Sequence, residues 1–154
     1  MKKLLFAVLI VSILFACKNE SNPTFDLVNA KKEIEAANHE ISQFMSKGDS
    51  AGMASAYSTE GSVMLNNMPS IKGKENLKKV WGGFINAGMS NISLNTLEVW
   101  GDDRFITEEG VFTVKSKDGI QLDKGKYIVL WKKEDGKWKL HRDMSNSDLP
   151  LATK

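Results

Sequence analysis

Two side chains near the carboxyl end of the chain have the chemistry of an acid–base pair. His141 and Asp143 are two residues apart, and alternation along a strand would put them on the same face. A carboxylate beside an imidazole can orient or charge it, and such a pair transfers protons near neutral pH. We therefore predict Asp143 and His141 as candidate catalytic residues. In the alternative interpretation, Asp143 only accepts local hydrogen bonds from Ser145 or Asn146, and His141 is exposed.

This prediction depends on which face of the strand points inward. The same alternation puts Trp138, Leu140 and Met144 on the opposite face. If that apolar face meets the core, His141 and Asp143 point away from any internal pocket.

Two further polar groups, Tyr57 and Glu60, lie earlier in the chain. In a functional interpretation, Tyr57 offers a phenol at the mouth of a pocket and Glu60 offers a carboxylate. In a structural interpretation, Tyr57 ends a helix with its ring buried and Glu60 lies in a solvated turn. We favour the structural interpretation for both.

The sequence lacks the residue patterns of metal sites, of nucleophilic hydrolases and of phosphate-binding loops. The only histidines, His39 and His141, are not spaced as a set of ligands, so no metal site is predicted. The chain has no Gly-x-Ser-x-Gly elbow and no glycine loop of the kind that cradles phosphates. We predict no cofactor.

The start of the chain predicts export and lipidation. Two lysines precede an apolar stretch that ends at Ala16 and is too short to cross roughly 30 Å of hydrocarbon, which is typical of a secretory signal over 1–16. The sequence Leu14-Phe15-Ala16-Cys17 resembles the bacterial lipobox, and Cys17 is the only cysteine. This implies a lipid on Cys17 and an anchor in a bacterial cell envelope, on the periplasmic or surface face of the outer membrane. The alternatives are an uncleaved anchor, or an ordinary signal with a chance cysteine.

The charge balance excludes one class of partner. The chain contains 21 Lys and Arg and 19 Asp and Glu, and two of the lysines lie in the predicted signal. The mature protein would be formally neutral and would lack the basic excess that binds nucleic-acid phosphates, so no nucleic-acid partner is predicted. Residues 17–25 would form a lipidated, flexible tether, 26–148 one domain and 149–154 a tail.

Helices are expected in the first half of this domain. Apolar residues three or four apart run from Leu27 to Phe44, which is typical of an amphipathic helix, with Asp26 as N-cap and Gly48 at its end. The predicted helices cover 26–47, a short segment after Asp49, and 74–87. A small hairpin is predicted between 62–65 and residue 71.

Strands are expected after residue 91, where the apolar period changes to two. They are predicted at 92–100, 105–116, 126–133 and 137–146. Asp135-Gly136 signals a tight hairpin turn before the last of them. Helices followed by an antiparallel meander predict an α+β domain with the helices on one face of the sheet.

Three stretches of the domain carry a family resemblance. They are Gly48-Asp49 with Tyr57-Ser58-Thr59-Glu60-Gly61; Ile71-Lys72-Gly73-Lys74-Glu75 through Trp81; and Gly125-Lys126-Tyr127 through Asp135-Gly136-Lys137-Trp138-Lys139-Leu140. Together they resemble the ketosteroid-isomerase-like and SnoaL-like (polyketide cyclase) branch of the nuclear-transport-factor-two-like superfamily. Residues 141–147 are most similar to an uncharacterised subgroup common among bacterial secreted proteins.

The resemblance covers 28–147 and implies a particular architecture. The expected fold is a cone-shaped α+β barrel, in which three N-terminal helices pack on a curved, mainly antiparallel sheet with an apolar pocket at its open end. A homodimer formed sheet to sheet is also implied. In such a cone the pocket wall is built from core side chains. We predict that this wall includes Tyr57, Trp81, Phe84, Trp100 and Trp131.

The resemblance also identifies isomerase groups that this chain lacks. Ketosteroid isomerases use a carboxylate base and a tyrosine of the oxyanion hole in an apolar site. The counterpart of the base is Leu65 and that of the tyrosine is Ile41, and neither can transfer a proton. Steroid-type isomerase chemistry is therefore not expected. The cyclase branch carries an acid/base carboxylate on its late strands, and Asp143 is its counterpart.

Three functions remain open. We favour a membrane-tethered module that binds a small apolar or amphipathic molecule without turnover, because both isomerase groups are lost. The first alternative is an acid–base enzyme of the polyketide-cyclase or isomerase-like type that acts on a carbonyl compound, and the second is a protein-interaction domain. An open cavity with a polar group at its end would favour the enzyme, a purely apolar cavity the binding module, and a closed one the interaction domain.

Overall fold

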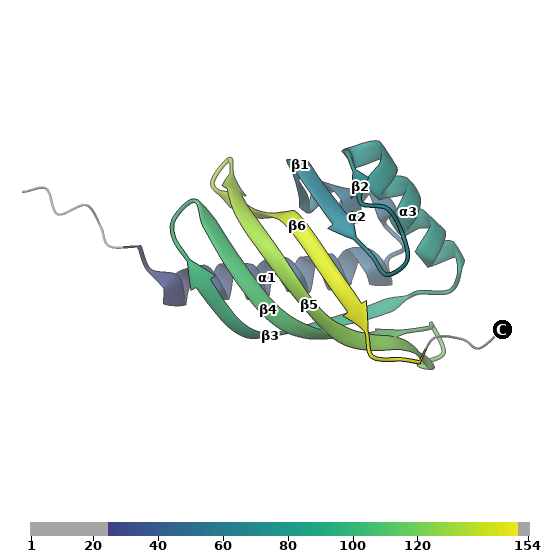
Figure 1. The fold of residues 1–154 in the computed structure, drawn as a ribbon. Coiled ribbons are helices and arrows are strands. Elements are labelled where there is room, and N and C mark those ends of the chain that lie inside the picture. The colour runs from purple at the N-terminus through teal and green to yellow at the C-terminus, as the bar shows by residue number, and fades with distance from the viewer. Residues whose placement is uncertain (1–24, 151–154) are drawn as a thin grey trace, which may run out of the picture.

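The computed structural model describes residues 25–150, and their fold is drawn in Figure 1. The predicted signal peptide, Cys17, the tether up to residue 24 and the last four residues of the tail lie outside the described residues. The helices and strands follow one another as α1 (Leu27–Ser46), α2 (Ser50–Ser55), β1 (Tyr57–Met64), β2 (Ile71–Lys72), α3 (Lys74–Asn86), β3 (Asn91–Gly101), β4 (Phe105–Lys115), β5 (Gln121–Glu134) and β6 (Lys137–Ser147).

A curved six-stranded sheet forms the body of the domain. Its strand order is β2-β1-β6-β5-β4-β3, and neighbouring strands are antiparallel except for β1 and β6, which run parallel. Helix α1 lies across the sheet, while α2 and α3 lie together near β1 and β2 (Figure 1). The predicted α+β cone, with three helices on a curved and mainly antiparallel sheet, is confirmed. Within residues 25–150, no helix is long and apolar enough to span a membrane.

The first helix begins and ends, and the second begins, at the residues that the sequence predicts. Asp26 caps α1 by accepting a hydrogen bond from the backbone N–H of Asn29, with an O···N distance of 2.9 Å. Gly48 follows α1 with a φ of +67°, a left-handed conformation that glycine adopts without steric cost. Asp49 then caps α2 by accepting from the backbone N–H of Gly52. The buried face of α1 consists of Ala30, Ile34, Asn38, Ile41 and Met45.

Two element boundaries differ from the prediction. Tyr57 does not end a helix, because α2 stops at Ser55 and Tyr57 is the first residue of β1. Strand β5 begins at Gln121 rather than at residue 126, since its early residues pair with the last residues of β4, from Phe112 to Lys115.

Strand β6 contains a β-bulge. Leu140 pairs with Trp131 on β5, and the next pair is Arg142 with Leu130. His141 is therefore an extra residue without a partner on β5. An extra residue of this kind reverses the alternation of side chains beyond it.

Strand β3 contains a second bulge. Thr96 pairs with Gly110 on β4, and the next pair is Glu98 with Glu109, so Leu97 is the extra residue. The side chains of β3 on either side of Leu97 consequently follow opposite alternations.

Candidate functional site

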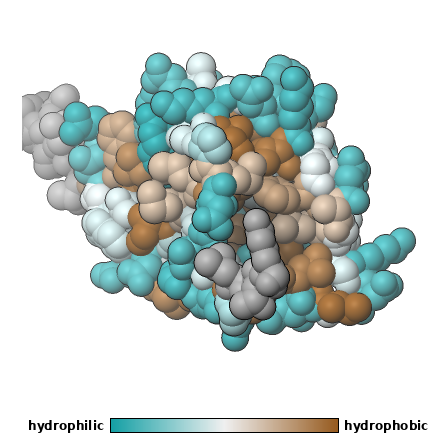
Figure 2. Space-filling view, turned by 45° about the vertical axis from the view of Figure 1, so that its right-hand side comes forward, coloured by the Kyte–Doolittle hydropathy of each residue, from teal (hydrophilic) through white to brown (hydrophobic). Residues whose placement is uncertain are grey.

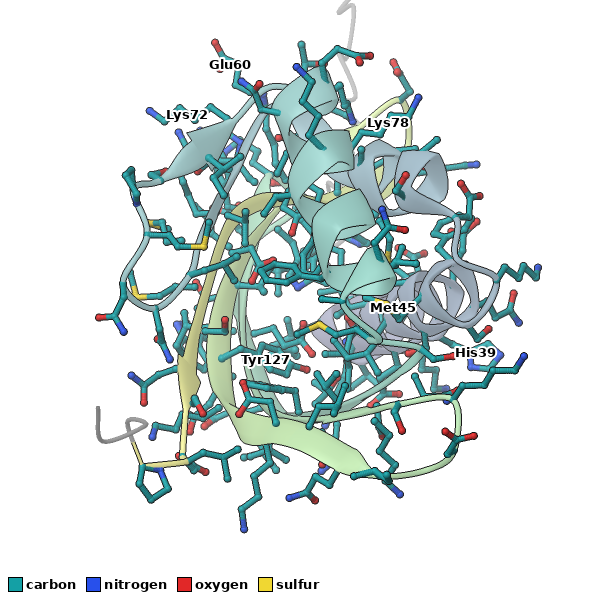
Figure 3. All side chains as sticks on the ribbon, turned by 90° about the vertical axis from the view of Figure 1, so that its right-hand side faces the viewer. His39, Met45, Glu60, Lys72, Lys78 and Tyr127 are labelled. Atoms are coloured by element: carbon teal, nitrogen blue, oxygen red, sulfur yellow. The ribbon has the colours of Figure 1, made fainter. Side chains whose placement is uncertain are left out.

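A cavity of about 260 Å³ lies between the inner face of the sheet and the helices. In Figure 3, Tyr127 and Met45 lie in the space between sheet and helices, whereas His39, Lys72 and Lys78 lie on the outside. Figure 2 shows part of this side of the molecule, with hydrophobic side chains gathered across its middle and hydrophilic ones along its upper margin. The apolar lining consists of Ile41, Met45, Met53, Leu65, Met68, Trp81, Phe84, Met89, Ile92, Leu94, Phe112, Val114, Val129 and Leu140.

A hydrogen-bonded carboxyl forms the polar centre of this lining. The hydroxyl of Tyr57 donates to Asp143, with an Oη···Oδ2 distance of 2.6 Å, and both side chains line the cavity. The bulge at His141 turns Asp143 inward. Met144, which an uninterrupted alternation would keep on the face of Leu140, is instead 52% exposed.

Burial changes the proton affinity of both groups. The pKa of Asp143 is raised from 3.8 to about 6, chiefly because burial disfavours the charged carboxylate. The hydrogen bond from Tyr57 acts in the opposite direction, and the nearby Glu108 raises this pKa further. The pKa of Tyr57 is raised well above its usual value, first by burial and then by the charge of Asp143, so the phenol remains a donor.

A second carboxyl lies behind the cavity wall. Glu108 on β4 is completely buried, with 0% of its surface exposed. Its Oε1 accepts from Asn38 Nδ2 at 2.8 Å, Thr96 Oγ1 at 2.6 Å and Tyr127 Oη at 2.7 Å. Its Oε2 accepts from Trp131 Nε1 at 2.8 Å. Four neutral donors thus satisfy this buried carboxyl without a basic side chain.

Glu108 also orients part of the cavity wall. Asn38 and Tyr127, two of its four donors, line the cavity. Burial and then the charge of Glu108 raise the pKa of Tyr127, which keeps its hydroxyl protonated and directed at Glu108. Gly110 lies opposite Tyr127 on β4 and leaves room for the ring, because a Cβ there would collide with it. Glu108 therefore fixes the orientation of Asn38 and Tyr127 from behind the cavity wall.

The ionisable lining is acidic. Asp123 and Asp143 contribute carboxyls, and within residues 25–150 no Lys, Arg or His lines the cavity. Asp123 accepts a hydrogen bond from the hydroxyl of Ser147 at 2.6 Å. The indole of Trp81 lines the cavity and is 8% exposed, and its N–H has no hydrogen-bond partner among the described residues. The same part of the chain contains no group of three or more His, Cys, Asp or Glu side chains that could hold a metal ion.

His141 does not share the cavity with Asp143. Its Nδ1 lies 2.9 Å from the hydroxyl oxygen of Ser58, and its ring is 5.9 Å from that of Phe105 between centroids. Burial lowers the pKa of His141, and nearby positive charges lower it further. The predicted His141–Asp143 pair is therefore not formed, because the bulge separates two residues that a regular strand would put on one face.

Of the five aromatic residues predicted to line the pocket, three line the cavity and two do not. Those in the lining are Tyr57, Trp81 and Phe84. Trp100 lies outside it and is 43% exposed, because the bulge at Leu97 turns it to the outer face of the sheet. Trp131 also lies outside it, fully buried, where it donates to Glu108.

Three further residues that the sequence singled out are Glu60, Leu65 and Ile41. Glu60 is exposed on the outside of the domain (Figure 3), as its structural interpretation expects, but it lies on strand β1 and not in a turn. Leu65 and Ile41 both line the cavity. The positions at which the resemblance implies isomerase groups are thus occupied by apolar side chains.

Sequence reasoning missed the buried carboxyl and its amide partner, although the chain contains a signal for both. Glu108 has the same parity on β4 as Ile106 and Phe112, which point inward. Asn38 lies four residues after Ile34, on the buried stripe of α1. A polar residue in step with an apolar set predicts a buried polar group.

Comparisons with known proteins identify the fold. No protein-family model and no curated protein matches the chain. A protein of unknown function with a cystatin-like fold from Nostoc punctiforme superposes with a TM-score of 0.70 at 17% identity, over 84% of this chain and 98% of that one. A nuclear-transport-factor-two-like protein from Novosphingobium aromaticivorans gives 0.68 at 13% identity, over 82% and 86%. A ketosteroid isomerase-like protein from Erwinia carotovora atroseptica gives 0.63 at 19% identity, over 77% and 96%.

These likenesses show the architecture. The chain has the cone-shaped α+β fold shared by nuclear-transport-factor-two-like and ketosteroid isomerase-like proteins. This fold supports many unrelated activities, so the function has to be argued from the cavity.

Proposed function

We propose that the domain is an acid–base enzyme of the SnoaL-like kind, which acts on a small and mostly apolar molecule with Asp143 as the proton-transferring group. The observation that carries the proposal is a carboxyl in an apolar cavity, held by one phenol and by no basic side chain among the described residues. A titratable group in such surroundings is typical of a functional site.

The surroundings of Asp143 suit a general base. A pKa of about 6 leaves the carboxylate mostly ionised at neutral pH, yet more basic than an exposed aspartate. The hydroxyl of Tyr57 fixes one carboxylate oxygen and leaves the other free to accept a proton. The apolar walls exclude water, which strengthens electrostatic effects inside the cavity.

A probe reaction tests the base without knowledge of the natural substrate. In 5-nitrobenzisoxazole, a base removes the ring C–H proton while the N–O bond breaks, and the coloured nitrophenolate product can be followed by absorbance. We expect turnover above the buffer rate that is lost in Asp143→Asn. His141→Ala is the matched control, because His141 does not line the cavity, and it should keep the rate. Equal rates for the protein and Asp143→Asn would refute catalysis by Asp143.

A second candidate function is ligand binding without turnover. It is favoured by Leu65 and Ile41, which present apolar surface at the positions implied for isomerase groups. Native mass spectrometry of residues 18–154 separates the two candidates when combined with the probe reaction. A small mass lost on denaturation, without probe turnover, would support a carrier.

We also propose that the mature protein is anchored through a lipid on Cys17. The support is the apolar stretch and the lipobox-like Leu14-Phe15-Ala16-Cys17. In bacteria fed labelled palmitate, the protein should become labelled and sediment with membranes. Cys17→Ala should remove both properties, and a labelled Cys17→Ala protein would overturn the proposal.

A homodimer through the outer face of the sheet is a further proposal. This face exposes Val111, Ile128 and Met144, and Ile128 pairs with Met144. Exposed apolar patches of this kind are typical of association surfaces. Light scattering should give a dimer for the protein and a monomer for Ile128→Lys.

A further inference from the structure

The cavity lining points to the charge of the molecule that it binds. Every ionisable side chain in the lining is an acid or a phenol: Asp123, Asp143, Tyr57 and Tyr127. Within residues 25–150, neither Asp143 nor the buried Glu108 forms an ion pair. A carboxylate that is buried without a counter-charge is costly, and a cation that enters the cavity removes this cost.

Four polar side chains around the cavity donate hydrogen bonds to carboxyls, whereas the indole N–H of Trp81 has no acceptor among the described residues. Tyr57 donates to Asp143, and Tyr127 and Asn38 donate to Glu108. Ser147 likewise donates to Asp123. What these groups can still offer to a ligand is mainly acceptor lone pairs on carboxylate, phenol and amide oxygens. At these four groups, a ligand that donates hydrogen bonds therefore fits better than one that presents a carbonyl oxygen or an anion.

The position of the acceptors allows one ligand group to meet several of them. Asp143 pairs with Val129, and Tyr127 pairs with Ser145, so Asp143 and Tyr127 lie diagonally on adjacent strands. Diagonal neighbours of this kind are about 7–8 Å apart, and one group between them can contact both. An ammonium group has three N–H donors for such a set.

The rest of the cavity suits an apolar body next to a cation. The rings of Trp81 and Phe84 meet edge to face at 5.8 Å between centroids, and both line the cavity. Aromatic faces attract ammonium groups, most strongly when water is excluded. The volume of about 260 Å³ suits a small molecule.

From this arrangement we propose that the cavity binds an amphipathic amine, with its ammonium group against Asp143 and its apolar body against the aromatic and methionine wall. The inference rests on the proposed function in one respect, namely that both use the cavity around Asp143. It replaces the carbonyl substrate implied by the family resemblance with a hydrogen-bond-donating cation.

Three probes with the same apolar body and different head groups test the inference on the purified protein at pH 7.5. They are 4-phenylbutylamine, 4-phenylbutanol and 4-phenylbutyrate, which carry a cation, a neutral hydroxyl and an anion. By isothermal titration calorimetry, we expect the amine to bind at least tenfold more tightly than the alcohol, and the carboxylate more weakly than both. Equal or tighter binding of the alcohol or the carboxylate would overturn the proposal.

Two variants test whether the preference for the amine depends on Asp143. In Asp143→Asn the preference for the amine over the alcohol should fall below threefold, while the affinity for the alcohol changes little. Glu60→Gln removes an exposed carboxyl outside the cavity and should leave all three affinities unchanged. A preference that persists in Asp143→Asn would refute the assigned contact, and a melting curve for each variant confirms that it is folded.

The inference and the proposed function can fail separately. Turnover of 5-nitrobenzisoxazole that depends on Asp143, without amine preference, would support the proposed enzyme and refute the amine ligand. Amine preference that depends on Asp143, without turnover, would leave the amine and make the domain a carrier.

Discussion

Two carboxyls on the inner face of the same sheet differ in how they are satisfied. Glu108 on β4 accepts four hydrogen bonds, from an amide, a threonine, a phenol and an indole. Asp143 on β6 accepts one, from Tyr57, and faces a cavity. Both lack a basic partner among the described residues, so the number of neutral donors is the main difference between them.

The difference separates a structural role from a chemical one. A carboxyl with all its lone pairs occupied holds its donors in place and has little left to offer a ligand. A carboxyl with one donor keeps free acceptor capacity, and its raised pKa of about 6 shows that its charged form is poorly stabilised. The first is expected to stabilise the fold, while the second costs stability and is available for function.

The largest expected effect comes from removing the satisfied carboxyl. Glu108→Ala removes the acceptor of four donors, three of which are buried, and we expect a loss of about 3–5 kcal/mol in the free energy of unfolding. Urea denaturation measures this loss. Glu108→Gln keeps the shape but sets its amide nitrogen against a donor, so it should cost less, about 1–3 kcal/mol. Losses below 1 kcal/mol for both variants would show that the four hydrogen bonds do not stabilise the fold.

Neutralising the unsatisfied carboxyl, Asp143, is expected to raise the free energy of unfolding instead of lowering it. The pKa of Asp143 in the folded protein, about 6, exceeds the usual 3.8, so the protonated form favours folding and this contribution is lost as the pH rises through that interval. Asparagine stays neutral at every pH. Asp143→Asn should therefore stabilise the protein at pH 7.5 by about 1–3 kcal/mol, since a tenfold change in proton affinity is worth about 1.4 kcal/mol.

Thermal melts at several pH values check this prediction. The advantage of Asp143→Asn over the parent should shrink below pH 6 and vanish near pH 4. A variant that is less stable than the parent at pH 7.5 would mean that the carboxylate is well stabilised, like Glu108.

A smaller effect is expected from removing the one donor to Asp143. The hydrogen bond from Tyr57 lowers the pKa of Asp143, so Tyr57→Phe should raise this pKa above about 6. The cost in stability should be about 1 kcal/mol. Titration of the carboxyl carbon by NMR measures the pKa directly. A pKa unchanged or lowered by Tyr57→Phe would contradict the role given to this phenol.

The smallest effect is expected at the bulge residue. His141 lies outside the cavity and bonds to Ser58, so His141→Ala should change stability by less than about 1 kcal/mol. It should also leave the pKa of Asp143 and the rate of the probe reaction unchanged. A large loss of probe turnover in this variant would restore the predicted His141–Asp143 pair.

The sequence predicted the elements well because their signals are local. The cap at Asp26, the left-handed Gly48 and the second cap at Asp49 set helix ends through contacts within a few residues. The α+β class follows from the order of helical and strand periods. The sequence also singled out Asp143, but beside His141, whereas the structure shows it bonded to Tyr57.

The errors at Trp100 and at the His141–Asp143 pair share one cause. Period-two reasoning assumes a regular strand, and the bulges at Leu97 and His141 each add one residue that only the pairing with a neighbouring strand reveals. The first bulge turned Trp100 outward, and the second turned Asp143 inward. The buried Glu108 was missed for another reason, since its donors come from three segments far apart in the chain, α1, β3 and β5.

By itself, the sequence determined the helices and strands, their order and the apolar faces that pack together, since these depend on local conformation and on burial periodicity. The tertiary structure alone decided which carboxyl is satisfied and which faces the cavity. That decision depends on strand register and on donors brought together from α1, β3 and β5, and these are properties of the packed chain rather than of any one segment.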